Sequence, residues 1–254
     1  MDIYFTILVF IIGVIFGSFY NVCIYRIPNK QSIVNPPSHC YKCNTRLKSM
    51  DLIPIFSWIF LKGKCRYCKE KISPRYIIVE LMIGILFTLI YINFKYKFIT
   101  IYYMFLISLL IIITFIHLDF CIIPDILVLI GSSIALVVNF LADGITFIDG
   151  IKGAICTGGG LLILTLIIEW ILNKEVIGDD YIKLFVMIGL FLGLKLSFLT
   201  LFFSIYIGVV YGIIFRIYNK VKSKKFNSVI LFVPFISLST IISLLYGNQI
   251  IDFL

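Results

Sequence analysis

Residues 100–118 read TIYYMFLISLLIIITFIHL, an unbroken run without lysine, arginine, aspartate or glutamate. A helix crosses the hydrocarbon core of a bilayer in about 20 such residues. The rest of the chain has the same character, because hydrophobic residues make up 61% of its 254 positions and charged residues only 14%. A soluble domain of this length needs a far more polar surface to cover its core. The sequence therefore predicts a protein that crosses the membrane several times.

Apolar runs of similar length recur and predict an all-α polytopic membrane protein with about eight transmembrane helices. They cover residues 3–23, 77–94, 100–118, 126–142, 153–172, 182–198, 200–217 and 228–247. The boundary between the sixth and seventh runs is weakly marked, because Lys195 is the only charge near it. The alternative for the first run is a cleaved signal peptide. No small-residue cleavage site follows that run, so we favour a transmembrane helix.

The positive charges indicate how the chain is oriented in the membrane. Eleven of the 22 basic residues lie within 24–76, and seven more lie in or directly beside the loops after the fifth and seventh runs. Only four lie in or near the remaining loops. Because basic loops stay on the cytoplasmic side, we expect the N-terminus outside and the 24–76 loop in the cytoplasm. The net charge of +9 then reflects membrane orientation, and we expect the lipid bilayer rather than nucleic acid as a partner.

The large basic loop contains two CxxC pairs, CYKC at 40–43 and CRYC at 65–68, separated by 21 residues. Each pair lets two thiolates approach one metal ion from the same turn, and two pairs complete a tetrahedral all-sulfur zinc site. The alternatives are two disulfides or reduced thiols, and disulfides are disfavoured in a cytoplasmic loop. Four cysteines leave no open position for water, so the predicted zinc is structural. Its candidate ligands are Cys40, Cys43, Cys65 and Cys68.

The other cysteines and the segment between the pairs have different expected roles. Cys23, Cys121 and Cys156 lie in or beside predicted spans, where we expect packing rather than metal binding. Residues 51–58, DLIPIFSW, are apolar enough to lie on the bilayer surface.

Several short motifs follow one another along nearly the whole chain. They are GSFYNV at 17–22, YRIP at 25–28, the two CxxC pairs with IP at 53–54 between them, PRYIIVEL at 74–81, IPD at 123–125, Gly178 with Lys183-Leu184, Gly189 with Gly193, and Pro234-Phe235. None is decisive alone, but the ordered set resembles the bacterial type IV prepilin peptidases.

The resemblance implies a bacterial inner-membrane enzyme with two activities. Members of the family cut the leader from prepilins and pseudopilins on the cytoplasmic side, as aspartic proteases with a GxGD motif. Many then N-methylate the new N-terminus with S-adenosylmethionine, and the zinc loop is associated with this methylation. For this chain the resemblance implies a prepilin or pseudopilin substrate helix and S-adenosylmethionine as a second cofactor beside zinc.

The chain departs from the family at both catalytic acids. In the family the first acid lies seven residues before the proline of an IPD or LPD segment, and counting back from Pro124 reaches His117. The second is the Asp of GxGDxKL, and an ungapped alignment from Gly178 places Tyr181 there. Carboxylates are present only near these positions, at Asp119 after His117 and at Asp179 and Asp180 before Tyr181.

Three interpretations of these carboxylates are open. Asp119 and Asp180 form a shifted pair, one ionised to activate water and the other protonated. This pair requires the helix to end before Asp119, which Pro124 favours, or a bulge at Asp180. Alternatively the protein is a proteolytically inactive paralogue that binds pilin-like segments or only methylates. In the third interpretation, His117 forms an acid–base pair with Asp179 or Asp180. We take Asp119 and Asp180 as the predicted catalytic residues.

These motifs divide the chain into three predicted domains. Residues 1–23 form a first transmembrane helix, 24–76 a cytoplasmic zinc-binding domain associated with methylation, and 77–254 a membrane-embedded peptidase domain of about seven helices. Glu80 lies in an apolar run, where an unpaired charge is costly. Glu80 could lie near the active site or the methylation pocket, or it could have a structural role, and the sequence leaves both interpretations open.

Overall fold

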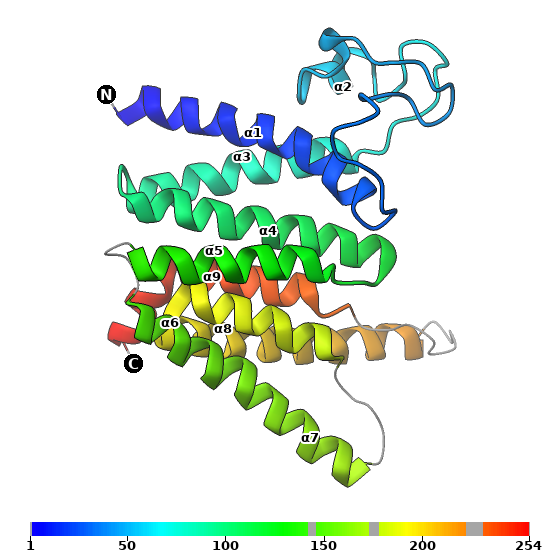
Figure 1. The fold of residues 1–254 in the computed structure, drawn as a ribbon. Coiled ribbons are helices and arrows are strands. Elements are labelled where there is room, and N and C mark those ends of the chain that lie inside the picture. Colours follow the sequence, from blue (N-terminus) through cyan, green and yellow to red (C-terminus); the bar gives the residue numbers. More distant parts are fainter. Residues whose placement is uncertain (1, 142–145, 173–177, 222–230, 254) are drawn as a thin grey trace. The chain divides into compact units, whose positions relative to one another are not determined.

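The structure is a computed structural model that describes residues 2–141, 146–172, 178–221 and 231–253, and these residues form helices and no strand (Figure 1). The elements are α1 (Asp2–Arg26), η1 (Ser49–Asp51), α2 (Phe56–Phe60), α3 (Arg75–Phe94), α4 (Phe98–Phe120), α5 (Asp125–Leu141), α6 (Phe147–Ala154), the π-helical η2 (Ile155–Gly159), α7 (Gly160–Leu172), α8 (Asp179–Val221) and α9 (Val233–Phe253). The predicted all-α fold is confirmed. The chain divides into two compact units, Met1–Ile116 and His117–Leu254.

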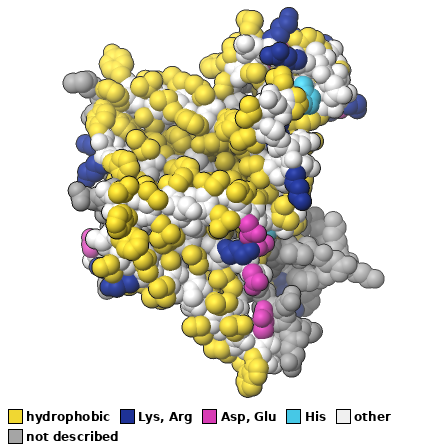
Figure 2. All heavy atoms as spheres, in the orientation of Figure 1, with side chains coloured by type: hydrophobic (Ala, Val, Ile, Leu, Met, Phe, Trp, Pro, Cys, Tyr) yellow, Lys and Arg dark blue, Asp and Glu magenta, His cyan; other side chains and the backbone are white. Residues whose placement is uncertain are grey.

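Six helical segments within the described residues are long and apolar enough to cross a bilayer. They are Ile3–Arg26, Arg75–Phe94, Phe98–Phe120, Phe147–Ile171, Asp179–Ile217 and Val233–Phe253. Helix α5 is apolar but shorter, at 17 residues. Outward faces carry large apolar side chains such as Ile101 and Leu129, 67% and 62% exposed, and Figure 2 shows hydrophobic side chains over much of the visible face. Such faces are unfavourable in water, and they fit contact with lipid.

The last three predicted spans have different bounds in the structure. The boundary predicted at 198–200 is wrong, because α8 breaks at Gly193, where φ is 72° and ψ is −176°. The two parts of α8 run in opposite directions from this break (Figure 1). The predicted last run, 228–247, is displaced, since α9 covers Val233–Phe253 and residues 228–230 lie outside the described residues. Pro234 explains this start, because proline fits the first turn of a helix and breaks its interior.

Close packing of glycines places the break in α8. A Cβ atom on Gly153 of α6 would lie 2.7 Å from the carbonyl carbon of Gly193, and one on Gly189 would lie 2.6 Å from the backbone nitrogen of Ala154. The two backbones therefore touch, and a residue with a side chain does not fit between them. The amide of Asn139 in α5 adds a buried hydrogen bond of 2.7 Å to the Leu190 carbonyl oxygen.

The first unit is built on a similar contact between α1 and α3. A Cβ on Gly13 would lie 2.8 Å from the Gly84 Cα, and one on Gly17 would lie 2.7 Å from the Glu80 Cα. Gly13 and Gly17 form a GxxxG pattern, which lets two membrane helices approach closely. The amide of Asn21 links the same helices by donating to the Tyr76 carbonyl oxygen over 3.0 Å.

The loop between α1 and α3 folds into a small module with two similar turns. Each CxxC turn is closed by a bridge between flanking residues, His39 with Arg46 and Lys64 with Lys71. Arg26, at the end of α1 and only 4% exposed, donates to the carbonyl oxygens of Ser32 at 2.9 Å and Pro36 at 2.8 Å. These two bonds fix the start of the module to the membrane helix.

Candidate functional site

The four predicted zinc ligands come together in the module. The Sγ atoms of Cys40, Cys43, Cys65 and Cys68 all lie within 4.8 Å of one another, and those of Cys40 and Cys68 are 3.7 Å apart. Zinc–sulfur bonds of about 2.3 Å in a tetrahedron place the sulfurs about 3.8 Å apart. The cluster therefore has the dimensions of a metal site, and the four cysteines could hold one ion. All four are free thiols rather than disulfides.

The thiols of this cluster differ in how easily they ionise. Hydrogen bonds from Thr45 lower the pKa of Cys43 to about 6. Burial opposes ionisation of Cys65, but backbone hydrogen bonds from Cys68 and Tyr67 hold its pKa below the usual value. The Glu70 amide favours the Cys68 thiolate, yet desolvation and the neighbouring sulfurs raise the pKa of Cys68 to about 11. Thiolates this close repel one another, and a bound divalent cation would remove that repulsion.

A second polar cluster lies in the unit His117–Leu254, at the end of α4 and the start of α8. The Nε2 atom of His117 lies 3.3 Å from the Tyr181 hydroxyl oxygen, and their rings meet edge to face. His117 is buried, at 4% exposure, and Tyr181 is half-buried. The two residues that the motif spacing predicts at the acid positions therefore contact each other directly.

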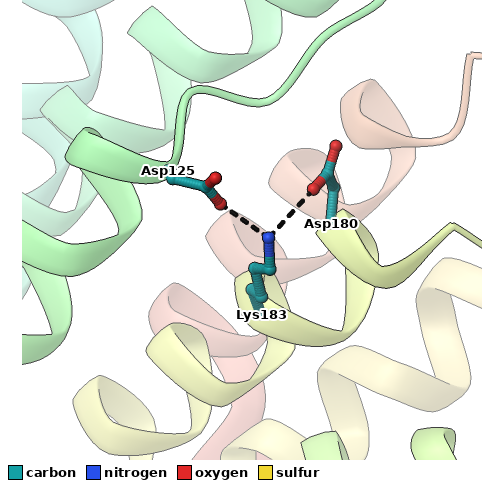
Figure 3. Close-up of polar contacts among 3 residues, drawn as sticks. All are labelled: Asp125, Asp180 and Lys183. Carbon is teal, nitrogen blue, oxygen red and sulfur yellow. Dashed lines mark hydrogen bonds and ion pairs between the residues drawn. The ribbon is translucent and has the colours of Figure 1, made fainter.

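A lysine joins two carboxylates at the same helix ends. The Nζ atom of Lys183 lies 2.7 Å from Oδ1 of Asp125 and 3.3 Å from Oδ1 of Asp180. Figure 3 shows the lysine side chain between the two, with Asp125 at the start of α5 and Asp180 at the start of α8. Both carboxylates also stand in the first turn of their helices, where the helix dipole favours negative charge. This ion-pair cluster was not anticipated from the sequence, although IPD and Gly178 with Lys183 were both noted as motifs.

The predicted pair Asp119–Asp180 required an early helix end or a bulge. Helix α4 instead continues to Phe120, and α8 begins at Asp179 without a bulge. On a continuous helix Asp119 is turned about 200° from His117, and Asp119 is exposed while His117 is buried. Asp180 lies near enough to His117 and Tyr181 to interact with both electrostatically. The Asp119–Asp180 pair stays a prediction.

Glu80 has a partner in the module rather than an unpaired charge. Its Oε2 accepts a hydrogen bond of 2.6 Å from the backbone nitrogen of Ile55, at the start of α2. Glu80 also lines a cavity of about 460 Å³ between the module and the adjoining ends of α1 and α3, called here the module cavity. Ser18 and Arg26 of α1 and Tyr76 of α3 line it too. No periodicity or motif in the sequence indicated this cavity, because its walls come from segments far apart in the chain.

Two sequence profiles match the chain. The profile of the bacterial peptidase A24 N-terminal domain matches residues 11–94, which contain α1 from residue 11 onward, the cysteine module and α3. The profile of the type IV leader peptidase family matches residues 104–213, which contain the His117–Tyr181 contact and Lys183.

Curated relatives extend the match to nearly the whole chain. A "Prepilin leader peptidase/N-methyltransferase" of Bacillus subtilis is 34% identical over 246 residues, covering 97% of this chain and 96% of the relative. Proteins of the same name from Myxococcus xanthus and Neisseria gonorrhoeae are 34% and 29% identical, and the matches cover 74% and 70% of this chain and 56% and 71% of those relatives. No solved structure matches the chain at a comparable level.

The match with the Bacillus subtilis relative spans both units and includes the cysteine module and the helices that carry His117 and Tyr181. The two family profiles fall on the same two parts of the chain in the same order. The chain belongs to the type IV leader peptidase family.

Proposed function

We propose that this chain is a multi-pass inner-membrane endopeptidase that removes the leader peptides of type IV prepilins or pseudopilins. The observation that carries the proposal is family membership along the full chain, including a relative named for leader cleavage that matches 97% of it. The contact between His117 and Tyr181 supports it, since α4 and α8 bring together the two residues that the motif spacing predicts at the family's acid positions.

The distribution of basic residues supports one orientation. Most lysines and arginines fall in alternate loops, and such loops stay in the cytoplasm. We therefore place the N-terminus outside and the cysteine module on the cytoplasmic side, together with the starts of α5 and α8. A prepilin leader carries its cleavage site on the same side of the membrane.

Hydrolysis of a peptide bond needs one group that activates water and another that donates to the carbonyl oxygen or the leaving amine. His117 can act as the base, and the Tyr181 hydroxyl beside it can donate a hydrogen bond. Asp180 is close enough to stabilise the imidazolium that forms when His117 takes a proton. The predicted Asp119–Asp180 pair uses the same Asp180, so the two arrangements differ in whether Asp119 or His117 is its partner.

A second candidate is a proteolytically inactive paralogue that still binds pilin-like segments or only methylates. The observation in its favour is that His117 and Tyr181, which the motif spacing predicts at the two acid positions, are not acids and contact each other. In addition, Lys183 pairs with the carboxylates of Asp125 and Asp180 and offsets one of their two negative charges, which leaves less of that charge to activate water.

Cleavage of a prepilin in lipid nanodiscs separates these possibilities. The protein is compared with its Asp119→Asn, Asp180→Asn and His117→Gln variants, and with the double variant His117→Asp/Tyr181→Asp, which restores the family residues. Loss of cleavage in Asp180→Asn and His117→Gln but not in Asp119→Asn supports the histidine-centred arrangement. Loss in both Asp119→Asn and Asp180→Asn supports the shifted pair. If only the double variant cleaves, the peptidase proposal is wrong and the site is an inactivated one.

We further propose that the module holds one structural zinc ion and that the protein N-methylates the new N-terminus with S-adenosylmethionine. The sulfur spacing of the cysteine cluster supports zinc. The name of the relatives supports methyl transfer. S-adenosylmethionine would supply an electrophilic methyl group on a positively charged sulfur. Zinc content of the purified protein and the mass of the processed N-terminus test the two statements.

A further inference from the structure

The cysteine module carries an exposed apolar surface on η1 and α2, which contact each other. On α2, Phe56 and Phe60 lie four positions apart on one helix face and are 60% and 80% exposed. Exposed apolar patches of this kind mark a surface that meets a partner. We call the exposed apolar residues of η1, α2 and the turn between them the apolar ridge, which consists of Met50, Leu52, Ile53, Phe56, Ile59 and Phe60.

The other side of α2 faces the interior of the module. Ser57, Trp58 and Leu61 line the module cavity. The Trp58 indole donates a hydrogen bond to the Ile72 carbonyl oxygen over 3.3 Å, and its ring lies against Gly63, where a Cβ would approach it to 2.8 Å. Helix α2 is thus amphipathic, and the contacts of its inner face hold the apolar ridge outward.

A hydrogen bond to a membrane helix sets the depth of α2. The backbone nitrogen of Ile55, the N-cap of α2, donates to Oε2 of Glu80 over 2.6 Å. The span that contains Glu80 begins at Arg75, and five residues at about 1.5 Å each place Glu80 about 8 Å inside its end. Amphipathic helices at a bilayer surface bury their apolar face about 5–10 Å into the boundary between headgroups and acyl chains. The start of α2 therefore lies at a depth where the apolar ridge meets lipid.

The backbone of Ile55 shows that this attachment is specific. Its φ of 62° lies in a region that a β-branched residue rarely adopts. Such a conformation persists where the surroundings hold it, and the buried Glu80 carboxylate accepts the hydrogen bond of this same residue. The direction in which α2 leaves α3 is therefore fixed by the fold.

The charge of the module favours anionic lipid as the partner of the apolar ridge. Residues 27–74 contain nine Lys or Arg and only two acidic residues, and both acids already form ion pairs within the module. A bound zinc ion with four thiolates carries two negative charges, which leaves the module positive. Lys48 stands two positions before the ridge and Lys62 two positions after it, and both are exposed. Figure 2 shows basic side chains beside hydrophobic ones on the visible face of the module.

We propose that the cysteine module docks on the bilayer surface through the apolar ridge, and that Lys48 and Lys62 at its two ends bind the headgroups of anionic phospholipids. The ridge supplies contact with acyl chains, and the lysines supply attraction to negative headgroups. The inference goes beyond the proposed peptidase, and it holds for either orientation of the chain in the membrane.

Quenching of tryptophan fluorescence by brominated lipids tests which lipid lies beside α2. The chain has two tryptophans, so Trp170→Phe leaves only Trp58, on α2. Zinc-loaded protein is placed in nanodiscs of phosphatidylcholine and phosphatidylglycerol in equal amounts, with bromine on the acyl chains of one lipid at a time. Brominated phosphatidylglycerol should quench more than brominated phosphatidylcholine, and bromine near the headgroup end of the chain more than bromine near the bilayer centre.

The lysines are tested with the double variant Lys48→Gln/Lys62→Gln. It should reduce the preference for phosphatidylglycerol by about fivefold for each lysine, and added salt should reduce the preference of the unmodified protein in the same direction. The matched control is Lys95→Gln/Lys97→Gln, which removes the same charge from exposed side chains at the other end of α3 and should leave the preference unchanged.

A second variant tests the apolar ridge independently of the lysines. Phe56→Gln/Phe60→Gln should reduce quenching by both lipids alike, and its zinc content should stay at that of the unmodified protein, because both side chains are exposed. Equal quenching by the two lipids, or a preference that persists in Lys48→Gln/Lys62→Gln, would overturn the proposed headgroup binding. If no brominated lipid quenches Trp58, the docking itself is wrong and the ridge is left for a protein partner.

Discussion

The attachment of the cysteine module to the membrane helix depends on Arg26. Its buried guanidinium donates to two carbonyl oxygens, of Ser32 at 2.9 Å and of Pro36 at 2.8 Å. Replacement by methionine keeps the aliphatic length and removes both hydrogen bonds. Each bond to a charged group contributes about 1.5–3 kcal/mol. We take the lower value for both, because the carbonyl oxygens regain water when the module opens, which gives about 3 kcal/mol in total.

The loss of these two hydrogen bonds can be measured through the rate at which the module releases its metal ion. If a bound zinc ion leaves through local opening of the module, about 3 kcal/mol raises the open population, and with it the release rate, about 100-fold. The assay follows transfer of zinc from the protein in nanodiscs to a coloured chelator, at chelator concentrations where the rate no longer depends on them.

The matched control is Arg46→Met, which removes the same charge from an exposed side chain between the two CxxC pairs. If the effect of Arg26 were only electrostatic, Arg46→Met would accelerate release as much. The reasoning is refuted if Arg26→Met releases zinc within about threefold of the control, the spread expected for contact energies.

Three further predictions concern the metal, the helix contact and the membrane. Cys65→Ser should lower the zinc content from one ion per chain to nearly none by elemental analysis, whereas Cys121→Ser, outside the cluster, should leave it unchanged; equal zinc in both would remove Cys65 from the ligands. Gly17→Ala should destabilise the protein by about 1–3 kcal/mol, because its Cβ would press on the α3 backbone; thermal unfolding in detergent measures this, and Gly160→Ala, with open space around it, should change little. Phe60, 80% exposed on α2, should touch lipid, so Phe60→Asp in a Trp170→Phe background should reduce quenching of Trp58 fluorescence by brominated lipids; unchanged quenching would mean that α2 stays off the membrane.

Composition and local spacing were enough to predict the membrane fold and the metal cluster. A transmembrane helix needs about 20 apolar residues in succession, and a CxxC turn brings two sulfurs together within one loop. Both are properties of short segments, so they can be predicted from the sequence without knowledge of the fold. The bounds of α8 and α9 were less accessible, because the break at Gly193 depends on the distant Gly153 that packs against it.

The arrangement at the polar cluster required the folded chain. The motif spacing predicted that His117 and Tyr181 stand at the positions of the family's acids, but it did not indicate that they contact each other or that Lys183 joins Asp125 to Asp180. These contacts link residues 58 and 64 positions apart in the sequence. They exist because the end of α4 and the starts of α5 and α8 lie close together in the fold.

The sequence alone determines what local chemistry can specify. These features are the apolar transmembrane helices, two cysteine turns for one metal ion and the ordered motifs of a family. The fold adds what depends on distance between remote segments, namely which helix faces meet, which carboxylates share a lysine and where a cavity remains. The module cavity belongs to the second group, because α1, α3 and the module each supply one wall. Hydrophobic runs and turns are encoded within a few residues, whereas the space between packed elements is a property of all of them together.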